Sequence, residues 1–284
     1  MSIVVTGATG HLGRHVVEQL LEKVPAEQIT AVVRSAEKAE DFARRGVRIA
    51  LADYNSPASF DGLFSAGDKV LLISGNEFDK GRVQQHKVVI DAAGAAGVAL
   101  LAYTSAPGTL TAALADDHRG TEELLTASGV PYTLLRNGWY HENYTENLAP
   151  VLEHHAVVAA AGEGKVSSAS RADYAAAAVA VLTGEGHENT TYELGGDTPW
   201  GFAEYAAELS RQTGEEIAYQ PVSPEALVSI LTGAGLPEPI AQTLAGVDAS
   251  IEKGELVVTT GDLSRLIGRP TTPLAEAVAA ALKG

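Results

Sequence analysis

Short apolar runs alternate with amphipathic segments through the first half of the chain. The apolar runs predict strands, which begin at residue 3 and continue at 29–33, 47–53, 70–74, 98–104 and 132–136. Between them, the spacing of apolar residues predicts helices at 35–45, 79–96 and 116–127, with Gly97 ending the second of these. Continuously apolar strands indicate a sheet covered on both faces, and a helix in each crossover indicates parallel strands. The pattern predicts an α/β fold with a doubly wound parallel sheet.

The second half of the chain is less regular. An alanine-rich helix is predicted at 170–183, strands near 191–194 and 217–222, and mostly helices from residue 200 onward. We therefore expect residues 1–150 to form the sheet domain, with late strands near 156–197 returning to it. Residues 198–284 are expected to form a smaller, interleaved α/β lobe on the substrate side, mostly helical.

A glycine-rich turn joins the first strand to the first helix. Gly7, Gly10 and Gly13 have the spacing G-x-x-G-x-x-G. The first glycine can take the positive φ of a sharp turn, the second lets a pyrophosphate approach the backbone, and the third lets the helix pack close to the strand. The free amides at the start of the helix would then bind phosphate. Because a strand precedes this turn and an amphipathic helix follows it, the turn predicts a dinucleotide site.

The residue that ends the second predicted strand indicates which dinucleotide binds. NAD sites usually place an acid there for the ribose 2′-hydroxyl, whereas NADP sites place a cation for the 2′-phosphate. This chain has Arg34 there and no acid; Lys38 follows one turn later, and Arg14 could reach the same phosphate. We therefore expect NADP. Asp53, which ends the third strand, either accepts a hydrogen bond from the adenine amino group or caps the turn at Ser56.

The helix predicted at 116–127 lacks the catalytic pair of ordinary short-chain dehydrogenases. Those enzymes place a Tyr and a Lys four residues apart on one face of this helix, and the Lys lowers the Tyr pKa for proton transfer. Here the same spacing holds His118 and Glu122, and only Ser105 after the preceding strand remains. A quinone or a cationic conjugated dye accepts hydride without acid catalysis, and water, His118 or Tyr140 would deliver any final proton. The missing Tyr/Lys pair is also consistent with a protein that catalyses no reaction.

Composition narrows the class of protein. The 284 residues are 45% hydrophobic and 20% charged, which indicates a filled core. A net charge of −16 disfavours nucleic acid and anionic membranes as partners. The absence of cysteine excludes disulfides, cysteine-ligated zinc and thiol catalysis, and we expect no metal, since His and carboxylates form no ligand motif. No leader precedes the first strand and no apolar stretch is long enough to span a bilayer, so we expect a cytoplasmic protein.

Several motifs along the whole chain resemble one known family. The motifs are Thr6-Gly-Ala-Thr-Gly-His-Leu-Gly13, Val33-Arg34, Ala52-Asp53-Tyr54, Leu72-Ile73-Ser74, Ala102-Tyr103-Thr104-Ser105, Tyr132-Thr-Leu-Leu-Arg-Asn-Gly-Trp-Tyr140 and Ser170-Arg-Ala-Asp-Tyr174. They resemble the NmrA-like branch of the atypical short-chain dehydrogenases. Within it, the bacterial NAD(P)H:quinone oxidoreductases of the second type are nearest, and the triphenylmethane dye reductases come second. The resemblance implies an NADP-binding Rossmann domain and a small C-terminal lobe.

The resemblance also assigns roles to single residues. It implies that the pyrophosphate contacts Gly7, Thr9, Gly10, His11 and Leu12, and that Arg34 contacts the 2′-phosphate. Ser74 and Gly75 would line the cofactor, Thr104 and Ser105 the nicotinamide ribose, and Asn137 ends the sixth strand beside the same site. Trp139, Tyr140 and Tyr144 would stack on a planar substrate ring, and Asn143 would hydrogen-bond a quinone oxygen. These aromatic side chains have a second interpretation as packing, which we favour for Trp139.

The resulting hypothesis is an NADPH-dependent reductase of quinones or similar conjugated acceptors, without flavin or metal. Tyr140, Asn143 and His118 are the candidate catalytic residues, and a monomer or a homodimer is compatible with the sequence. One alternative is a reductase of triphenylmethane dyes. The other class of function is a non-enzymatic NADP sensor of the NmrA type, which binds the cofactor without turning it over. Reduction of a phenylcoumaran-like ether comes last, because that reaction expects a lysine that residues 116–127 lack.

Overall fold

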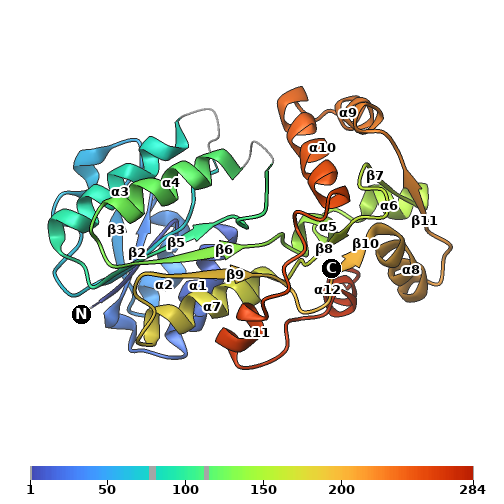
Figure 1. The fold of residues 1–284 in the computed structure, drawn as a ribbon. Coiled ribbons are helices and arrows are strands. Elements are labelled where there is room, and N and C mark those ends of the chain that lie inside the picture. The colour runs from blue at the N-terminus through green and yellow to red at the C-terminus, as the bar shows by residue number, and fades with distance from the viewer. Residues whose placement is uncertain (1, 77–80, 112–114, 284) are drawn as a thin grey trace. The chain divides into compact units, whose positions relative to one another are not determined.

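A computed structural model describes residues 2–76, 81–111 and 115–283. The chain forms two compact units whose segments alternate along the sequence (Figure 1). Unit 1 comprises residues 1–106, 117–137 and 171–192, and unit 2 comprises residues 107–116, 138–170 and 193–284. The sequence predicted a simpler division near residues 150 and 198, because contacts between distant segments leave no local pattern. The predicted domains, residues 1–150 and 198–284, stay a prediction.

Unit 1 is built on a seven-stranded sheet with the order β3-β2-β1-β4-β5-β6-β9. Its strands are β1 (Ile3–Thr6), β2 (Ile29–Val33), β3 (Arg48–Leu51), β4 (Lys69–Leu72), β5 (Leu100–Ser105), β6 (Tyr132–Asn137) and β9 (Thr190–Leu194). Every pairing from β3 to β6 is parallel. The strand order reverses between β1 and β4, as in a doubly wound sheet. The predicted α/β fold is confirmed.

The helices of unit 1 lie on both faces of this sheet, with α3 and α4 along one face and α1 and α7 along the other (Figure 1). Their bounds, with those of the shorter turns, are α1 (His11–Leu21), η1 (Ala26–Gln28), η2 (Glu37–Ala39), α2 (Glu40–Arg44), η3 (Pro57–Phe60), α3 (Arg82–Ala96), α4 (Asp116–Ala127) and α7 (Arg171–Thr183). The helix predicted at 79–96 is described from Arg82, and residues 79–80 lie outside the described residues. Gly97 ends α3 with a φ of 68°, as predicted. The helix predicted at 35–45 is instead divided into η2 and α2.

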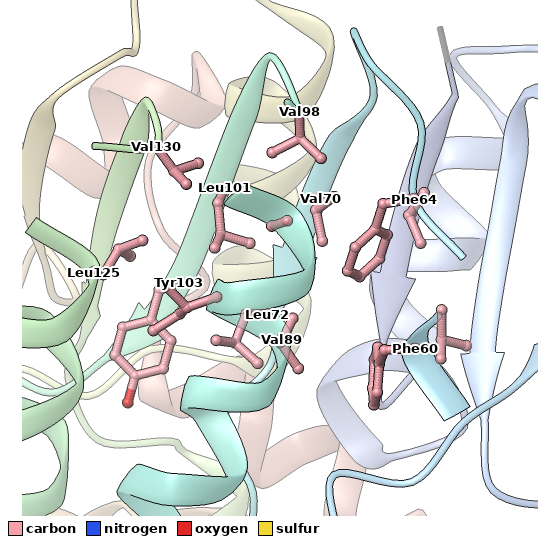
Figure 2. Close-up of a cluster of buried hydrophobic side chains, with 14 of the residues drawn as sticks. Phe60, Phe64, Val70, Leu72, Val89, Val98, Leu101, Tyr103, Leu125 and Val130 are labelled. Carbon is pink, nitrogen blue, oxygen red and sulfur yellow. The ribbon is translucent and has the colours of Figure 1, made fainter. Parts of the chain in front are cut away.

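A continuous apolar core fills the space between the sheet and α3. Figure 2 shows side chains from β4 and β5, among them Val70, Leu72 and Leu101, packed against Val89 of α3. Tyr103 of β5 has no exposed surface, although its hydroxyl is polar. Burial of each large apolar side chain stabilises a fold by about 1.5–3 kcal/mol. The packed layer between the sheet and α3 therefore stabilises the strands whose carboxyl ends carry the candidate site.

Unit 2 contains two short sheets and several helices. β7 (Ala156–Ala159) pairs in parallel with β11 (Ala218–Pro221), and β8 (Lys165–Val166) pairs antiparallel with β10 (Trp200–Gly201). The helices are α5 (Glu142–Thr145), α6 (Ala149–His154), α8 (Phe202–Thr213), α9 (Pro224–Gly233), α10 (Glu238–Glu252), α11 (Asp262–Ile267) and α12 (Leu274–Ala281). Ser223 caps α9 by accepting the Ala226 N–H at 3.2 Å, with Pro224 at the first helical position.

One expectation about the late strands needs correction. We expected strands near 156–197 to return to the first sheet, and β9 does so, but β7 and β8 pair within unit 2. A short apolar run predicts a strand without indicating its partner, because pairing depends on segments far away in sequence. Of the helices in the described residues 2–76, 81–111 and 115–283, none combines the length and the apolar character that crossing a bilayer requires.

Asp248 of α10 carries an ionisable group that destabilises the fold at neutral pH. Burial raises the pKa of its carboxyl to about 6, although Oδ2 accepts the Ala160 N–H at 2.7 Å. The folded protein therefore keeps this proton over a pH range in which the unfolded chain has already lost it. Stability consequently falls as the pH rises from about 4 to about 6.

We expect Asp248→Asn to remove this pH dependence, because asparagine cannot ionise. The variant should match the wild type near pH 4 and exceed it by about 1–3 kcal/mol above pH 7, as measured by urea denaturation at several pH values. The control is Asp91→Asn, an exposed carboxylate on α3 that pairs with Lys87. A stability difference that is the same at every pH would contradict this explanation.

Candidate functional site

The turn after β1 has the geometry predicted from its glycines. Gly7 has a φ of 61°, and its carbonyl accepts the Gly10 N–H at 2.9 Å. A Cβ on Gly13 would lie 2.3 Å from the Gly7 carbonyl oxygen and 2.8 Å from Ala8 Cα, so only glycine fits where α1 crosses the strand. Gly10 is the N-cap of α1 and supplies no side chain to its first amides. Those amides remain available for an anion.

The remaining residues expected at the pyrophosphate lie along the same turn. Thr9 is half-buried and His11 is exposed at the first position of α1. Leu12 is buried among the apolar residues of α1, so its backbone is the part that faces a ligand. Arg34 is exposed directly after β2.

Arg14 is already committed to protein contacts. Its Nη1 donates to Asp41 Oδ2 at 2.9 Å, its Nη2 donates to the Lys38 carbonyl at 2.6 Å, and the guanidinium lies 5.3 Å from the centre of the Phe42 ring. Arg14 would have to leave these partners to bind the 2′-phosphate, and the contact of Arg34 with that phosphate stays a prediction.

Asp53 shapes the turn before η3. Its Oδ1 accepts the backbone N–H of Asn55 at 2.9 Å and the Asn55 side-chain amide at 3.2 Å. The Ser59 hydroxyl donates to the Ser56 carbonyl at 2.6 Å within the same turn. These contacts correspond to the structural alternative for Asp53, and its contact with adenine stays a prediction.

Tyr54, beside Asp53, is a residue whose role the sequence did not reveal. Its hydroxyl donates to the Ile73 carbonyl at 2.9 Å and lies 2.5 Å from the Thr6 hydroxyl. Thr6 in turn donates to the Leu71 carbonyl at 3.1 Å. Burial raises the pKa of the Tyr54 phenol. This ring therefore fixes the carboxyl ends of β1 and β4 against each other, on either side of the reversal in strand order.

The loop after β4 is held by side chains from two neighbouring elements. Thr104 Oγ1 accepts the Ser74 N–H at 2.9 Å, and His86 Nε2 accepts the Gly75 N–H at 2.9 Å. Because Nε2 of His86 accepts, its Nδ1 carries the proton and donates to Thr121 Oγ1 at 2.8 Å. Burial lowers the pKa of His86 to about 3, so the ring stays neutral. Ser74 and Gly75 thus have a defined backbone position.

His118 lies in the same buried network. Arg82 Nη2 donates to its Nε2 at 2.9 Å, so the neutral ring carries its proton on Nδ1, which donates to the Tyr103 hydroxyl at 2.9 Å. Burial, together with the adjacent Arg82 guanidinium, lowers the pKa of His118 to about 2. Both ring nitrogens are occupied and the ring is 8% exposed. This geometry favours a structural role, and proton donation by His118 stays a prediction.

Glu122, at the position of the missing lysine, is part of a three-residue cluster. Its Oε1 accepts the Ser105 hydroxyl at 2.6 Å and Arg136 Nε at 2.9 Å, and its Oε2 accepts Arg136 Nη2 at 2.6 Å. The three residues come from the ends of β5 and β6 and from α4. A partly buried ion pair between Glu122 and Arg136 therefore includes the position at which an ordinary short-chain dehydrogenase has its lysine.

Asn137, at the end of β6, carries an unsatisfied atom. The residue is 6% exposed, and its Oδ1 is buried without a hydrogen-bond partner among the described residues. A buried acceptor without a donor costs about 1–3 kcal/mol. A ligand with a hydroxyl or amide hydrogen would supply that donor. Together with the uncapped amides of α1, this atom shows that the carboxyl edge of the sheet fits a dinucleotide.

The residues expected at the substrate belong to unit 2. Asn143 is exposed on α5, and Tyr140 is half-buried, with its backbone bridged to Ala169. Trp139 is half-buried as well. Tyr144 packs edge-on against Trp200, with 5.0 Å between ring centres, and its hydroxyl is buried without a partner within the described part of the chain. These are the contacts of a core ring, so stacking of Tyr144 on a substrate stays a prediction.

His141 was missed by the sequence reasoning, although it follows Tyr140 directly. Its Nε2 donates to the Thr272 carbonyl at 2.9 Å, so its Nδ1 accepts from the Ser168 hydroxyl at 2.9 Å. Ser168 in turn accepts the Trp200 Nε1–H at 2.8 Å. This directed chain fixes the segment that carries Tyr140 and Asn143. A lone histidine in a sequence gives no signal of such partners.

In residues 2–76, 81–111 and 115–283, no group of three or more His, Cys, Asp or Glu side chains is placed to hold a metal ion.

Comparison with known proteins identifies relatives over the whole chain. A family model described as NAD(P)H-binding matches residues 7–185. Quinone oxidoreductase 2 of Escherichia coli strain K12 is 47% identical over 278 residues, which are 97% of each chain. The crystal structure of the NADPH-dependent quinone oxidoreductase of E. coli with NADPH matches with a TM-score of 0.95 and 46% identity, over 99% of both chains. The Citrobacter sp. triphenylmethane reductase with NADP(H) matches with a TM-score of 0.94 and 44% identity, over 99% of this chain and 100% of that one.

Proposed function

Since the chain belongs to the NAD(P)H-binding family, we propose that it is an NADPH-dependent reductase that transfers hydride directly to quinones or similar electron-poor conjugated acceptors. The observation that carries this proposal is the similarity to Quinone oxidoreductase 2, at 47% identity over 97% of both chains. We propose that the reaction needs neither flavin nor metal. The proposed location is the cytoplasm, and the proposed assembly is a monomer or a homodimer.

In this proposal the cofactor lies across the carboxyl edge of the sheet in unit 1. The α1 amides and the turn from Gly7 to Gly13 hold the pyrophosphate, and Arg34 holds the 2′-phosphate. Ser74 and Gly75, positioned by Thr104 and His86, line the middle of the cofactor. Ser105 and Asn137 are the proposed contacts of the nicotinamide half.

In this proposal the protein orients the acceptor against the nicotinamide and contributes little acid catalysis. When bound, NADPH supplies a hydride, and a quinone that accepts it needs one further proton to become a hydroquinone. Glu122 is ion-paired with Arg136. Burial and the Arg82 charge lower the pKa of His118 to about 2, so this ring is neutral at neutral pH, and both of its nitrogens are hydrogen-bonded, which makes it the least favoured of the predicted proton donors. We assign that proton to solvent, with Tyr140 as the alternative donor and Asn143 as the hydrogen-bond partner of the quinone oxygen.

Triphenylmethane dyes are a second proposed class of acceptor. The similarity to the Citrobacter sp. triphenylmethane reductase, with a TM-score of 0.94, supports it. A cationic conjugated dye becomes a neutral leuco compound on hydride addition and needs no proton at all. The same site residues serve both acceptors.

The test is a steady-state panel of acceptors with NADPH and with NADH, on protein purified without added flavin. We expect benzoquinone and menadione to support NADPH oxidation above the uncatalysed rate, and NADPH to be preferred over NADH. Crystal violet in the same panel tests the dye class.

Turnover with dyes but not quinones would replace the first proposal by the second. Binding of NADPH without turnover of any acceptor would contradict both and support the NADP sensor.

A further inference from the structure

Ser105, Glu122 and Arg136 form a hydrogen-bonded group in which every distance is short. The Ser105 hydroxyl donates to Glu122 Oε1 at 2.6 Å. Arg136 donates from Nε to Oε1 at 2.9 Å and from Nη2 to Oε2 at 2.6 Å. Ser105 is 4% exposed and Glu122 is 8% exposed. Bonds of this kind to a charged carboxylate are stronger than neutral ones and hold a fixed geometry.

The hydrogens of this group can be assigned one by one. Arg136 donates two of its hydrogens, on Nε and Nη2, to Glu122, because a guanidinium can donate but not accept. Glu122 is therefore the acceptor in all three hydrogen bonds of the group. A serine hydroxyl has one hydrogen, and Ser105 donates it to Glu122 Oε1. Only lone pairs remain on the Ser105 oxygen for any other partner.

Ser105 is the last residue of β5. In the sheet, β2, which Arg34 follows, lies on one side of β1, and β4 and then β5 lie on the other side. A dinucleotide that places its adenosine phosphate at Arg34 and its pyrophosphate at the turn after β1 extends its nicotinamide half across β4 toward β5. The neighbouring Thr104 already holds the loop after β4 through Ser74. The nicotinamide riboside is thus the part of the cofactor that comes to the end of β5.

We propose that Glu122, held by Arg136, is a positioning residue that makes Ser105 an obligate hydrogen-bond acceptor for the nicotinamide riboside half of the cofactor, an inference that rests on the proposed function. The donors on that half are the ribose hydroxyls and the carboxamide NH2. In this arrangement Glu122, at the position of the dehydrogenase Lys, orients the cofactor through Ser105 and transfers no proton. Ser105 contacts the cofactor directly, and Glu122 acts only through Ser105.

The experiment is a double-mutant cycle read by the dissociation constants of NADPH and of 2′,5′-ADP, which lacks the nicotinamide riboside. The proteins are wild type, Ser105→Ala, Glu122→Gln and the double variant. Glutamine keeps the shape of Glu122 but offers one oxygen to three donor hydrogens, so the Ser105 hydrogen is free to turn outward. Asp91→Asn, an exposed member of the Lys87–Asp91 pair, is the control.

We expect Ser105→Ala to weaken NADPH binding about five- to tenfold and Glu122→Gln about three- to tenfold. The double variant should bind NADPH within about twofold of Ser105→Ala, because residues that act through one contact are not additive. Binding of 2′,5′-ADP should change less than about twofold in every variant. A role for Glu122 in the fold alone would instead weaken both ligands together.

The 3-acetylpyridine analogue of NADP, which has no amide hydrogen, shows whether the carboxamide or a ribose hydroxyl donates to Ser105. If the carboxamide donates, the Ser105→Ala penalty disappears with this analogue, whereas a ribose hydroxyl donor leaves it unchanged. Unchanged NADPH binding in Ser105→Ala, or an equal Glu122→Gln penalty with and without Ser105, overturns the proposal. If Glu122→Gln fails to fold, Glu122→Asp, which keeps the charge and shortens the side chain out of reach of Ser105, takes its place in the cycle. Because only binding is measured, failure of quinone reduction is a separate result.

Discussion

Replacing Gly13 by alanine is expected to abolish NADPH binding and to lower the stability of unit 1. The new Cβ would lie 2.3 Å from the Gly7 carbonyl oxygen and within 3 Å of two Ala8 backbone atoms. None of these atoms belongs to a flexible side chain, so α1 or the turn must shift. Overpacking of this kind costs about 1–3 kcal/mol and occasionally more, and the shift displaces the amides that would hold the pyrophosphate. Titration with NADPH and a thermal melt measure the two effects.

The matched control is Gly94→Ala on α3. Gly94 is also a helical glycine, but it is exposed and its Cβ would meet only Val130 Cγ2, at an ordinary 3.4 Å. Alanine in a helix is more favourable than glycine by about 0.8–1.0 kcal/mol, so this variant should be as stable as the wild type or more so. Normal NADPH affinity in Gly13→Ala would show that the close crossing of α1 and β1 is not needed for binding.

Replacing Arg34 by alanine is expected to raise the KM for NADPH by about 10- to 100-fold and to leave the KM for NADH nearly unchanged. A guanidinium on a phosphate forms charge-assisted bonds worth about 1.5–3 kcal/mol, and NADH lacks the 2′-phosphate that would receive them. Arg34→Lys should fall between the two, because lysine keeps the charge and loses the planar fork. Steady-state kinetics with both cofactors and one acceptor give the comparison.

Arg45→Ala controls for the loss of a positive charge from the same protein. Arg45 is half-exposed and pairs with Glu18 at 2.5 Å. It should change the KM for NADPH by less than about twofold. An equal rise in the KM for both cofactors in Arg34→Ala would mean that Arg34 does not contact the 2′-phosphate, and Arg14 would have to leave Asp41 to do so.

The fold of unit 1 was predictable because its signals are local. Continuous apolar runs predicted β2 and β5, and the end of α3 at Gly97 followed from the left-handed conformation that glycine adopts at a helix end. β7 shows where this reasoning ends. Its apolar run predicts a strand, but its parallel pairing with β11 joins segments about sixty residues apart, and no short-range pattern encodes that.

The candidate site was predictable in its glycines for the same reason, since Gly7 and Gly13 are required by backbone geometry alone. The polar partners were not. His118 and Glu122 were recognised as replacements for Tyr and Lys, but Arg82 and Arg136, which determine their proton positions, come from other elements. A buried network depends on which side chains the finished fold brings together, so a single sequence shows its members without its connections.

The glycine at the start of α1 has a thermodynamic consequence. Because Gly10 provides no capping side chain, a bound cofactor phosphate would complete the first turn of α1. A ligand that binds the folded state alone adds RT ln(1 + [L]/Kd) to its stability, about 2.7 kcal/mol at a hundred times Kd. The free concentration of the reduced cofactor then sets how long unit 1 survives unfolding and proteolysis, which couples the lifetime of the protein to the supply of its own reductant.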